Sequence, residues 1–351
     1  MNPNMRWVLF LTTPCLVKSF SSAMPGRKAF AAYAASQDGS FSGDVGVLFD
    51  FDGTLGDTES PAMEVAYWEL APFFASRPVP TCIDYVRENA GRAFEHMVED
   101  CEKDRASNNL GTIASVLKTV TSTLEADYVK DVNDNRVKCG LPVLEEAITQ
   151  YDDLLTMQKE ETVQSLAVCA TEVPGCKEML EGLDAMGKDK VKYCIATTSG
   201  KPRVPVSIDA AGLRAHFTPE SVHSGESDFT PPRFKPDPAV YFRAAEWVGI
   251  DPANCIAVED SASGVGSASN ADIALIVGYV GASHIAPSAK ESHAKMLMSG
   301  TRADSGRGAT FVLEDMRDLP SVVAAFRESK CSGSDDLLSA AAGCKGKVYM
   351  P

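Results

Sequence analysis

A five-residue apolar run, Val45–Phe49, leads directly into the sequence Asp-Phe-Asp-Gly-Thr-Leu at residues 50–55. A continuous apolar run of this length is typical of a parallel strand that is buried on both faces. In an open parallel sheet, ligands bind beyond the carboxyl ends of the strands. Asp50 and Asp52 would face the same way if the strand geometry persists, and Gly53 would let the backbone turn sharply beside a ligand. The segment therefore predicts a buried strand that ends in a ligand site.

Similar apolar runs recur in the second half of the chain, where they alternate with segments of helical spacing. We expect strands at 191–196, 255–258, 274–277 and 310–313, with helices between them. Such alternation implies right-handed βαβ units and a parallel sheet. The stretch from about 61 to 170 has apolar residues at helical spacing and few β-branched runs. The predicted fold class is α/β, a Rossmann-like doubly wound parallel sheet with an inserted α-helical cap domain.

These patterns also divide the chain. We expect a catalytic core from residues 44–60 and 171–327, and the helical cap domain from 61–170. Residues 328–351 are rich in Ser, Gly, Ala and Lys, a composition that favours a flexible tail. Residues 1–43 differ in composition from the rest and are treated as a leader.

The leader has no acidic residue before Asp38 and carries spread basic residues among Ser, Ala and Phe. Its apolar run at 7–11 is too short to span a bilayer. This composition favours a targeting segment, and its two-part character resembles leaders that send proteins into plastids through a secretory step. We therefore expect an organelle, the plastid, as the location. The alternative is an N-terminal tail on a cytoplasmic enzyme.

The overall composition narrows the class of protein further. A net charge of −15 opposes a broad nucleic-acid-binding surface, because phosphate backbones repel it. Hydrophobic content of 44% and charged content of 23% are ordinary for a globular protein. Ten cysteines form no C-x-x-C pair and no zinc-spaced cluster with histidine, so reduced thiols are expected. We expect a monomer or dimer that has neither nucleic acid nor membrane as a partner.

Three further segments place chemistry at strand ends. Strand 191–196 runs into Thr197, Thr198 and Ser199, which offer hydroxyl and backbone N–H groups. Lys235 lies between prolines that stiffen the chain before a helix. Strand 255–258 ends in Glu259 and Asp260, and acids that end a buried strand are costly unless a cation or hydrogen-bond donors meet them.

The four segments in this order resemble the haloacid dehalogenase superfamily, in the branch that contains phosphoglycolate phosphatase, sugar phosphatases and beta-phosphoglucomutase. The resemblance covers residues 45–325. It implies a magnesium-dependent phosphatase that hydrolyses a small phosphorylated metabolite, with a sugar phosphate favoured, through an aspartyl-phosphate intermediate. The interval from Asp50 to Thr197 is longer than the cap of that family requires, and we expect the excess between about 99 and 150.

The resemblance also implies roles for individual residues. Asp50 would be the nucleophile, and Asp52 would exchange protons with the leaving oxygen and with water. Mg²⁺ would lie between the Asp50 carboxylate, the Asp52 backbone carbonyl and the Asp260 carboxylate, with Glu259 orienting these ligands or joining them.

The remaining assignments concern the substrate. Lys235 would offset the negative charge of a carboxylate that approaches a phosphate. Thr197 and the backbone N–H groups of Phe51 and Thr198 would hold the transferring oxygens. Gly53 and Thr54 would line the same site. Arg92 lies in a segment that resembles the cap loop of this branch, and it would bind a sugar hydroxyl or a second anionic group.

Four alternatives remain open. A haloalkanoic acid dehalogenase lacks the second aspartate, so Asp52 disfavours it. A phosphosugar mutase resembling beta-phosphoglucomutase would carry a histidine twelve residues after the nucleophile, where this chain has Ala62, which cannot exchange a proton. Phosphoglycolate as the substrate fits the same motifs. A binding module without activity would require lost motif residues, and all of them are present.

Overall fold

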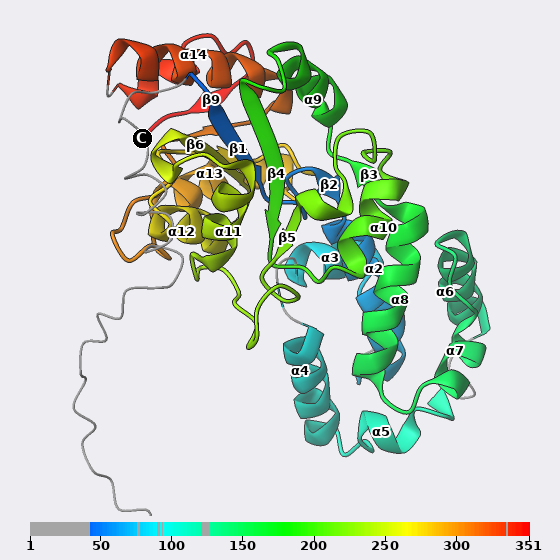
Figure 1. Ribbon diagram of the computed structural model, residues 1–351. Helices are drawn as coiled ribbons and strands as arrows, with labels where there is room; N and C mark the ends of the chain where they lie inside the picture. The colour runs from blue at the N-terminus through cyan, green and yellow to red at the C-terminus, as the bar shows by residue number, and fades with distance from the viewer. Residues whose placement is uncertain (1–42, 76–77, 90–91, 93, 121–125, 335) are drawn as a thin grey trace, which may run out of the picture.

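The computed structural model describes residues 43–351 apart from 76–77, 90–91, 93, 121–125 and 335 (Figure 1). The leader predicted for residues 1–43 lies outside the described residues except for its last one. In the described part of the chain, every helix is too short or too polar to cross a membrane.

A seven-stranded sheet forms the centre of the molecule, in the order β5-β4-β1-β6-β7-β8-β9. Neighbouring strands are parallel except for β8 and β9. Because β1 lies inside the sheet with later strands on both sides, the sheet is doubly wound, as the sequence predicts. The strands are β1 (Val45–Phe49), β4 (Val191–Thr197), β5 (Val222–Ser224), β6 (Cys255–Glu259), β7 (Leu275–Tyr279), β8 (Phe311–Leu313) and β9 (Val348–Tyr349).

The four strands predicted after residue 171 coincide with β4, β6, β7 and β8 to within two residues at each end. Helix α11 packs against β4, β1 and β5, α12 against β6 and β7, and α13 against β7 and β8, while α14 packs on α9. The helices that flank the sheet are α9 (Cys176–Ala185), α10 (Arg203–Ala210), α11 (Ala239–Val248), α12 (Ala262–Asn270), α13 (Lys290–Met298) and α14 (Leu319–Ser332).

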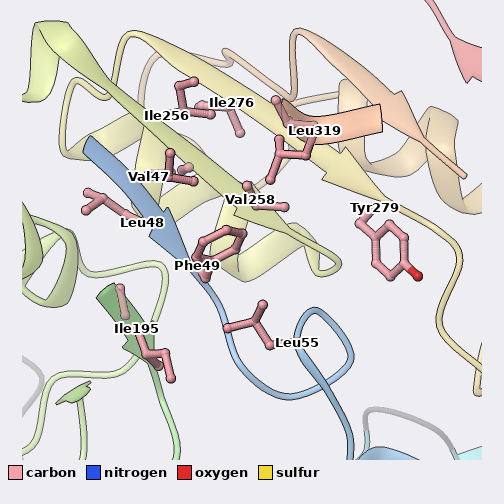
Figure 2. Close-up of a cluster of buried hydrophobic side chains, with 14 of the residues drawn as sticks. Val47, Leu48, Phe49, Leu55, Ile195, Ile256, Val258, Ile276, Tyr279 and Leu319 are labelled. Carbon is pink, nitrogen blue, oxygen red and sulfur yellow. The ribbon is translucent and has the colours of Figure 1, made fainter. Parts of the chain in front are cut away.

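Apolar side chains from adjacent strands hold the centre of the sheet together. Phe49 and Val258 are register partners on β1 and β6, and Figure 2 shows their side chains close together, with Leu55 on the loop below them. The Phe49 ring lies edge-on to the rings of Tyr193 and Phe217, with centroids 6.3 Å and 6.4 Å apart. Since all of these side chains except that of Tyr193 are fully buried, Asp50 follows a strand that is packed on both faces.

A block of helices lies between two very short strands, β2 (Gly56–Asp57) and β3 (Thr171–Glu172), which pair with each other antiparallel. The block has a hydrophobic cluster of its own, with Trp68, Phe73, Leu144 and Met157 among its buried members. Figure 1 shows it beside the sheet, and α8 packs against α10 of the sheet domain. The helices of the block are α2 (Glu59–Leu70), α3 (Cys82–Asn89), α4 (Phe94–Ser107), α5 (Ile113–Val116), α6 (Ala126–Lys138), α7 (Leu144–Gln150) and α8 (Leu154–Cys169).

Local signals explain how these helices begin and end. Asp153 caps α8, because its carboxylate accepts a hydrogen bond from the Thr156 backbone N–H at 2.8 Å. Gly140 follows α6 with a φ of +75°, a conformation that glycine adopts without strain at helix C-termini. The extra residues expected between about 99 and 150 contain the end of α4 and all of α5, α6 and α7.

Three charged side chains lie in the middle of the helical block. Glu69 on α2, Arg136 on α6 and Glu161 on α8 are all fully buried. Arg136 donates to Glu161 at 2.7 Å, while neither carboxylate oxygen of Glu69 has a partner among the described residues. Burial, reinforced by the charge of Glu161, raises the pKa of Glu69 well above its usual value. Glu69 therefore stays protonated to a higher pH than an ordinary glutamate does.

The segment for which a flexible tail is predicted, residues 328–351, contains regular secondary structure. Helix α14 continues to Ser332, and β9 pairs with β8 at the edge of the sheet. The Asp318 carboxylate accepts hydrogen bonds from the backbone N–H groups of Lys345 and Gly346, both at 2.8 Å. These contacts join residues that are distant in the sequence, which an argument from composition does not consider.

Candidate active site

The loop after β1 folds back tightly on itself. The Phe51 carbonyl accepts hydrogen bonds from the backbone N–H groups of Leu55 and Gly56 at 3.0 Å and 2.9 Å. Gly53 has a φ of +79°, and a Cβ atom there would lie 2.0 Å from the Asp260 Oδ2 atom. Glycine is therefore required at residue 53 for two reasons, its conformation and its close approach to Asp260.

Three carboxylates converge beyond the ends of β1 and β6. One oxygen from each of Asp50, Glu259 and Asp260 lies within 4.8 Å of the others. Glu259 is fully buried, and Asp50 and Asp260 are each 7% exposed. The backbone N–H of Asp50 donates to the Val258 carbonyl at 3.0 Å, which ties the ends of the two strands together. The structure thus brings together three of the residues that the sequence nominated for a metal.

Lys235 enters this cluster from the loop before α11. Its Nζ atom donates to Asp50 Oδ1 at 2.5 Å and to Glu259 Oε1 at 2.6 Å, and the lysine side chain is 3% exposed. The Tyr241 hydroxyl donates to the same Glu259 oxygen at 2.5 Å. Burial alone would lower the pKa of Lys235, but the two carboxylates raise it. Lys235 therefore stays charged.

One ammonium group does not balance three buried carboxylates. The pKa of Asp50 is raised to about 7, mainly by burial; Glu259 and Asp52 add to the rise, and the charge of Lys235 only partly opposes it. Burial, then Asp50 and Glu259, raise the pKa of Asp260 well above its usual value. Mg²⁺ prefers carboxylate oxygens as ligands, and a divalent cation would offset the excess negative charge. The donor set therefore fits Mg²⁺.

Asp52 points to a separate group of hydrogen-bond donors. Thr58 donates to its Oδ1 atom at 2.5 Å, Ser199 to Oδ2 at 2.6 Å, and Arg203 to Oδ1 at 2.9 Å. Although burial would raise the pKa of Asp52, the charge of Arg203 and these hydrogen bonds hold it below its usual value. The Asp52 side chain is not part of the carboxylate cluster, so only its backbone carbonyl could serve a cation there.

The hydroxyl residues at the strand ends are placed differently from one another. Thr197 is buried at the end of β4, and its Oγ1 atom accepts from the Ser199 backbone N–H at 3.1 Å. The Thr198 carbonyl accepts from Glu226 at 3.3 Å. Thr54 is fully buried, and its hydroxyl has no hydrogen-bond partner among the described residues. Thr54 thus carries a buried hydroxyl that is unsatisfied within the described part of the chain.

Arg92 lies apart from these residues in its contacts. It follows α3 in the helical block, where it donates to Asn89 at 2.8 Å and to Asp100 at 2.6 Å. Its side chain is 40% exposed. The structure therefore pairs Arg92 within the helical block rather than with the strand-end cluster.

Sequence reasoning did not identify several residues that contact the site. Arg203 and Thr58 hold Asp52, Tyr241 holds Glu259, and His284 lies beside Asp260, with Nε2 3.5 Å from Oδ2. Thr58 follows the motif closely enough that its hydroxyl could have been noticed. The other residues reach the site only when distant elements pack together, and no motif in the sequence around them predicts this.

The chain matches the family model described as haloacid dehalogenase-like hydrolase over residues 46–272. This match covers more than half of the chain and includes all three residues of the carboxylate cluster, Asp50, Glu259 and Asp260. The chain therefore belongs to the haloacid dehalogenase-like hydrolase family.

Similar proteins support the same family. A phosphoglycolate phosphatase of Pseudomonas savastanoi pv. phaseolicola is 25% identical over 251 residues, which cover 72% of this chain and 75% of that protein. A CBBY-like protein of Arabidopsis thaliana is 37% identical over 87 residues, covering 25% of this chain and 26% of its own length. This chain therefore matches about a quarter of the length of that relative.

A solved structure supports the fold as well. The crystal structure of a conserved haloacid dehalogenase-like protein of unknown function from Agrobacterium tumefaciens has a TM-score of 0.54 and 23% identity. The match covers 80% of this chain and 98% of that one. Since its identity is low, this likeness concerns the fold alone.

Proposed function

We propose that this protein is a Mg²⁺-dependent phosphatase that hydrolyses a small phosphate monoester, with sugar phosphates as the favoured class, through an aspartyl-phosphate intermediate. The observation that carries the proposal is the pairing of Asp50 with buried Lys235 inside a cluster of three carboxylates. A lone buried acid would stay protonated, whereas a positive neighbour favours the nucleophilic carboxylate.

In the first step, a carboxylate oxygen of Asp50 attacks phosphorus in line, and the bond from phosphorus to the ester oxygen breaks. Asp52 gives a proton to that leaving oxygen. Because the donors around it favour its ionised form, Asp52 takes up this proton when the substrate phosphate binds beside it. Lys235, Thr197 and the backbone N–H of Thr198 hold the charge on the transferring oxygens. Gly53 lets the loop approach Asp260 closely, and Thr54 is proposed to line the same site.

In the second step, water attacks the phosphorus of the aspartyl phosphate, Asp52 accepts the proton of that water, and the bond to Asp50 breaks. The donors around Asp52 favour its ionised form, which is the form that this step requires. Mg²⁺ held by Asp50, the Asp52 carbonyl, Asp260 and Glu259 would supply positive charge against the phosphoryl oxygens.

The helical block from 61–170 is proposed as a cap that selects the substrate. It has its own hydrophobic cluster, and the chain enters and leaves it through the paired strands β2 and β3. Arg92 is proposed as a substrate contact on this cap. Because it is paired with Asp100, a substrate anion would have to compete with that carboxylate.

Phosphoglycolate is the second candidate substrate, because the Pseudomonas relative named phosphoglycolate phosphatase matches most of this chain. A phosphosugar mutase is disfavoured. At the position where the mutase has its histidine, Ala62 is buried on α2, and it can neither donate nor accept a proton. Without that residue, Asp52 would activate water as soon as the aspartyl phosphate forms.

The test is turnover of p-nitrophenyl phosphate by the purified chain, with Mg²⁺ and with EDTA, and with Asp50→Asn as the control for contaminating phosphatases. Release of phosphate that needs both Mg²⁺ and Asp50 is expected. Equal turnover by the Asn variant, or turnover that EDTA does not reduce, would contradict the mechanism. A panel of phosphorylated metabolites, including 2-phosphoglycolate and pentose and hexose phosphates, would then identify the substrate.

The leader at residues 1–43 is proposed to direct the protein to an organelle, the plastid. A fluorescent fusion of that segment should enter the organelle and lose its N-terminus. A diffuse cytoplasmic signal with an intact N-terminus by mass spectrometry would refute this proposal.

A further inference from the structure

The loop after β7 reaches two places at once. Ser283 donates to Asp57 of β2 at 2.8 Å, and its hydroxyl lies 3.3 Å from that of Ser60 at the start of α2. The next residue, His284, turns its ring toward Asp260, with Nε2 3.5 Å from Oδ2. The contacts of Ser283 fix the loop, so the imidazole of His284 is held beside the carboxylate cluster.

The imidazole of His284 is enclosed. Its side chain is 12% exposed, and its Cε1 atom lies 2.8 Å from the place where a Cβ atom on Gly53 would be. Nε2 faces Asp260, and the other ring nitrogen, Nδ1, is buried without a partner among the described residues. A buried polar atom without a partner costs free energy, and the contact of the ring with Asp260 can offset this cost.

A second histidine contacts the same aspartate. His293 on α13 donates from Nε2 to the Asp260 backbone carbonyl at 2.6 Å. The chain has five histidines in all, so two of the five contact Asp260, one at its carboxylate and one at its backbone. Neither is among the three residues whose oxygens form the cluster. Both histidines therefore contact Asp260 without belonging to the cluster of possible metal ligands.

We propose that His284 is a positioning residue for the cation site: its Nε2–H holds the Asp260 carboxylate in the orientation that binds the metal. This inference rests on the proposed function, since it assumes that the cluster binds a divalent cation. Carboxylates that ligate metals are themselves held by hydrogen bonds, and removing such a partner typically weakens metal binding about 10–100-fold. Within the described part of the chain, the ion pair of the Asp260 carboxylate is with His284, while Lys235 is bound to Asp50 and Glu259.

The experiment measures Mn²⁺ binding to the full chain without substrate, by the electron paramagnetic resonance signal of free Mn²⁺. Variant His284→Leu fills the space without donating, and His284→Gln keeps an N–H donor at a similar reach. The matched control is His223→Leu, because His223 is also buried with an unpartnered ring nitrogen but belongs to β5. Circular dichroism checks that each variant folds, and His284→Ala replaces the Leu variant if that one does not.

We expect the Mn²⁺ dissociation constant to rise about 10–100-fold in His284→Leu, to change little in His223→Leu, and to recover most of the loss in His284→Gln. If the wild type binds Mn²⁺ and His284→Leu binds it with the same dissociation constant, the inference about His284 is overturned while the proposed metal site stands. Equal weakening in the His223 control would overturn it too, because any lost buried histidine would then suffice. A wild-type chain that binds no Mn²⁺ would overturn the proposed metal dependence and this inference with it.

Discussion

Replacing Lys235 with methionine removes a charge while keeping most of the side-chain stem. In the structure this ammonium group is the shared partner of Asp50 and Glu259, and all three side chains are nearly or fully buried. Removing one partner of a buried ion pair costs about 3–5 kcal/mol, because the remaining charge is left unpaired. Since whole domains are stable by only about 5–15 kcal/mol, the variant should lose a large part of its stability in the absence of metal.

The pH dependence of this loss follows from Asp50. Its pKa is about 7 in the folded protein and about 3.9 in an unfolded chain, so folding takes up a proton and stability falls as pH rises between these values. Without Lys235 the folded pKa moves higher still. The wild type stops losing stability from Asp50 above about pH 7, whereas the variant continues to lose up to about 1.4 kcal/mol per pH unit.

Urea unfolding followed by circular dichroism, with EDTA present, measures this loss at pH 6, 7, 8 and 9. The double variant Lys235→Met/Glu259→Gln should recover part of the stability, because it removes one of the unpaired carboxylates. A loss below about 1 kcal/mol at pH 8 would refute the reasoning from buried charges. So would a loss that shrinks as the pH rises.

Three further predictions follow from the same contacts. Asp50→Asn should fold like the wild type but turn over at least about a hundredfold more slowly, because an amide is no nucleophile; near-normal rates would reject Asp50 as the nucleophile. Asp260→Ala should raise the Mg²⁺ concentration for half-maximal activity at least about tenfold, and an unchanged requirement would remove it from the cation site. The pKa of Glu69 is raised in the folded protein. The free energy of unfolding therefore falls as the pH rises above the pKa that this glutamate has in the unfolded chain. Glu69→Gln should flatten this slope, by at most about 1.4 kcal/mol per pH unit, in urea unfolding with Glu178→Gln as a surface control; an unchanged slope would contradict a protonated Glu69.

The sheet was predictable because parallel strands are continuous apolar runs with short connections. Strand β5 was missed, since it has only three residues and two of them are His223 and Ser224. Strand β9 was missed because its pairing depends on Asp318 and Glu314, which a composition argument about the tail does not consider. Length and apolar continuity are local properties, whereas edge pairing is not.

The candidate site divides in the same way. Asp50, Glu259 and Asp260 could be nominated from the sequence because each lies at the end of a buried strand, where parallel strands converge. Arg203 and His284 could not, because they reach Asp52 and Asp260 only when distant elements pack together. The sequence suggested that Arg92 contacts the substrate. In the structure Arg92 is paired with Asp100, a residue that belongs to none of the motifs.

The two-residue strand β9 has a consequence for how the molecule behaves among other copies of itself. An open sheet edge offers unpaired N–H and carbonyl groups that can recruit a strand from another chain. Here the last residues of the chain cover the β8 edge, run against the direction of the other strands, and carry Lys347 over the Tyr349 ring. An outer strand of two residues, with a lysine directly before it, is a poor template for intermolecular pairing. Removing β9 would expose the backbone groups of β8 that now pair with it, and would leave a longer parallel edge strand open to another chain.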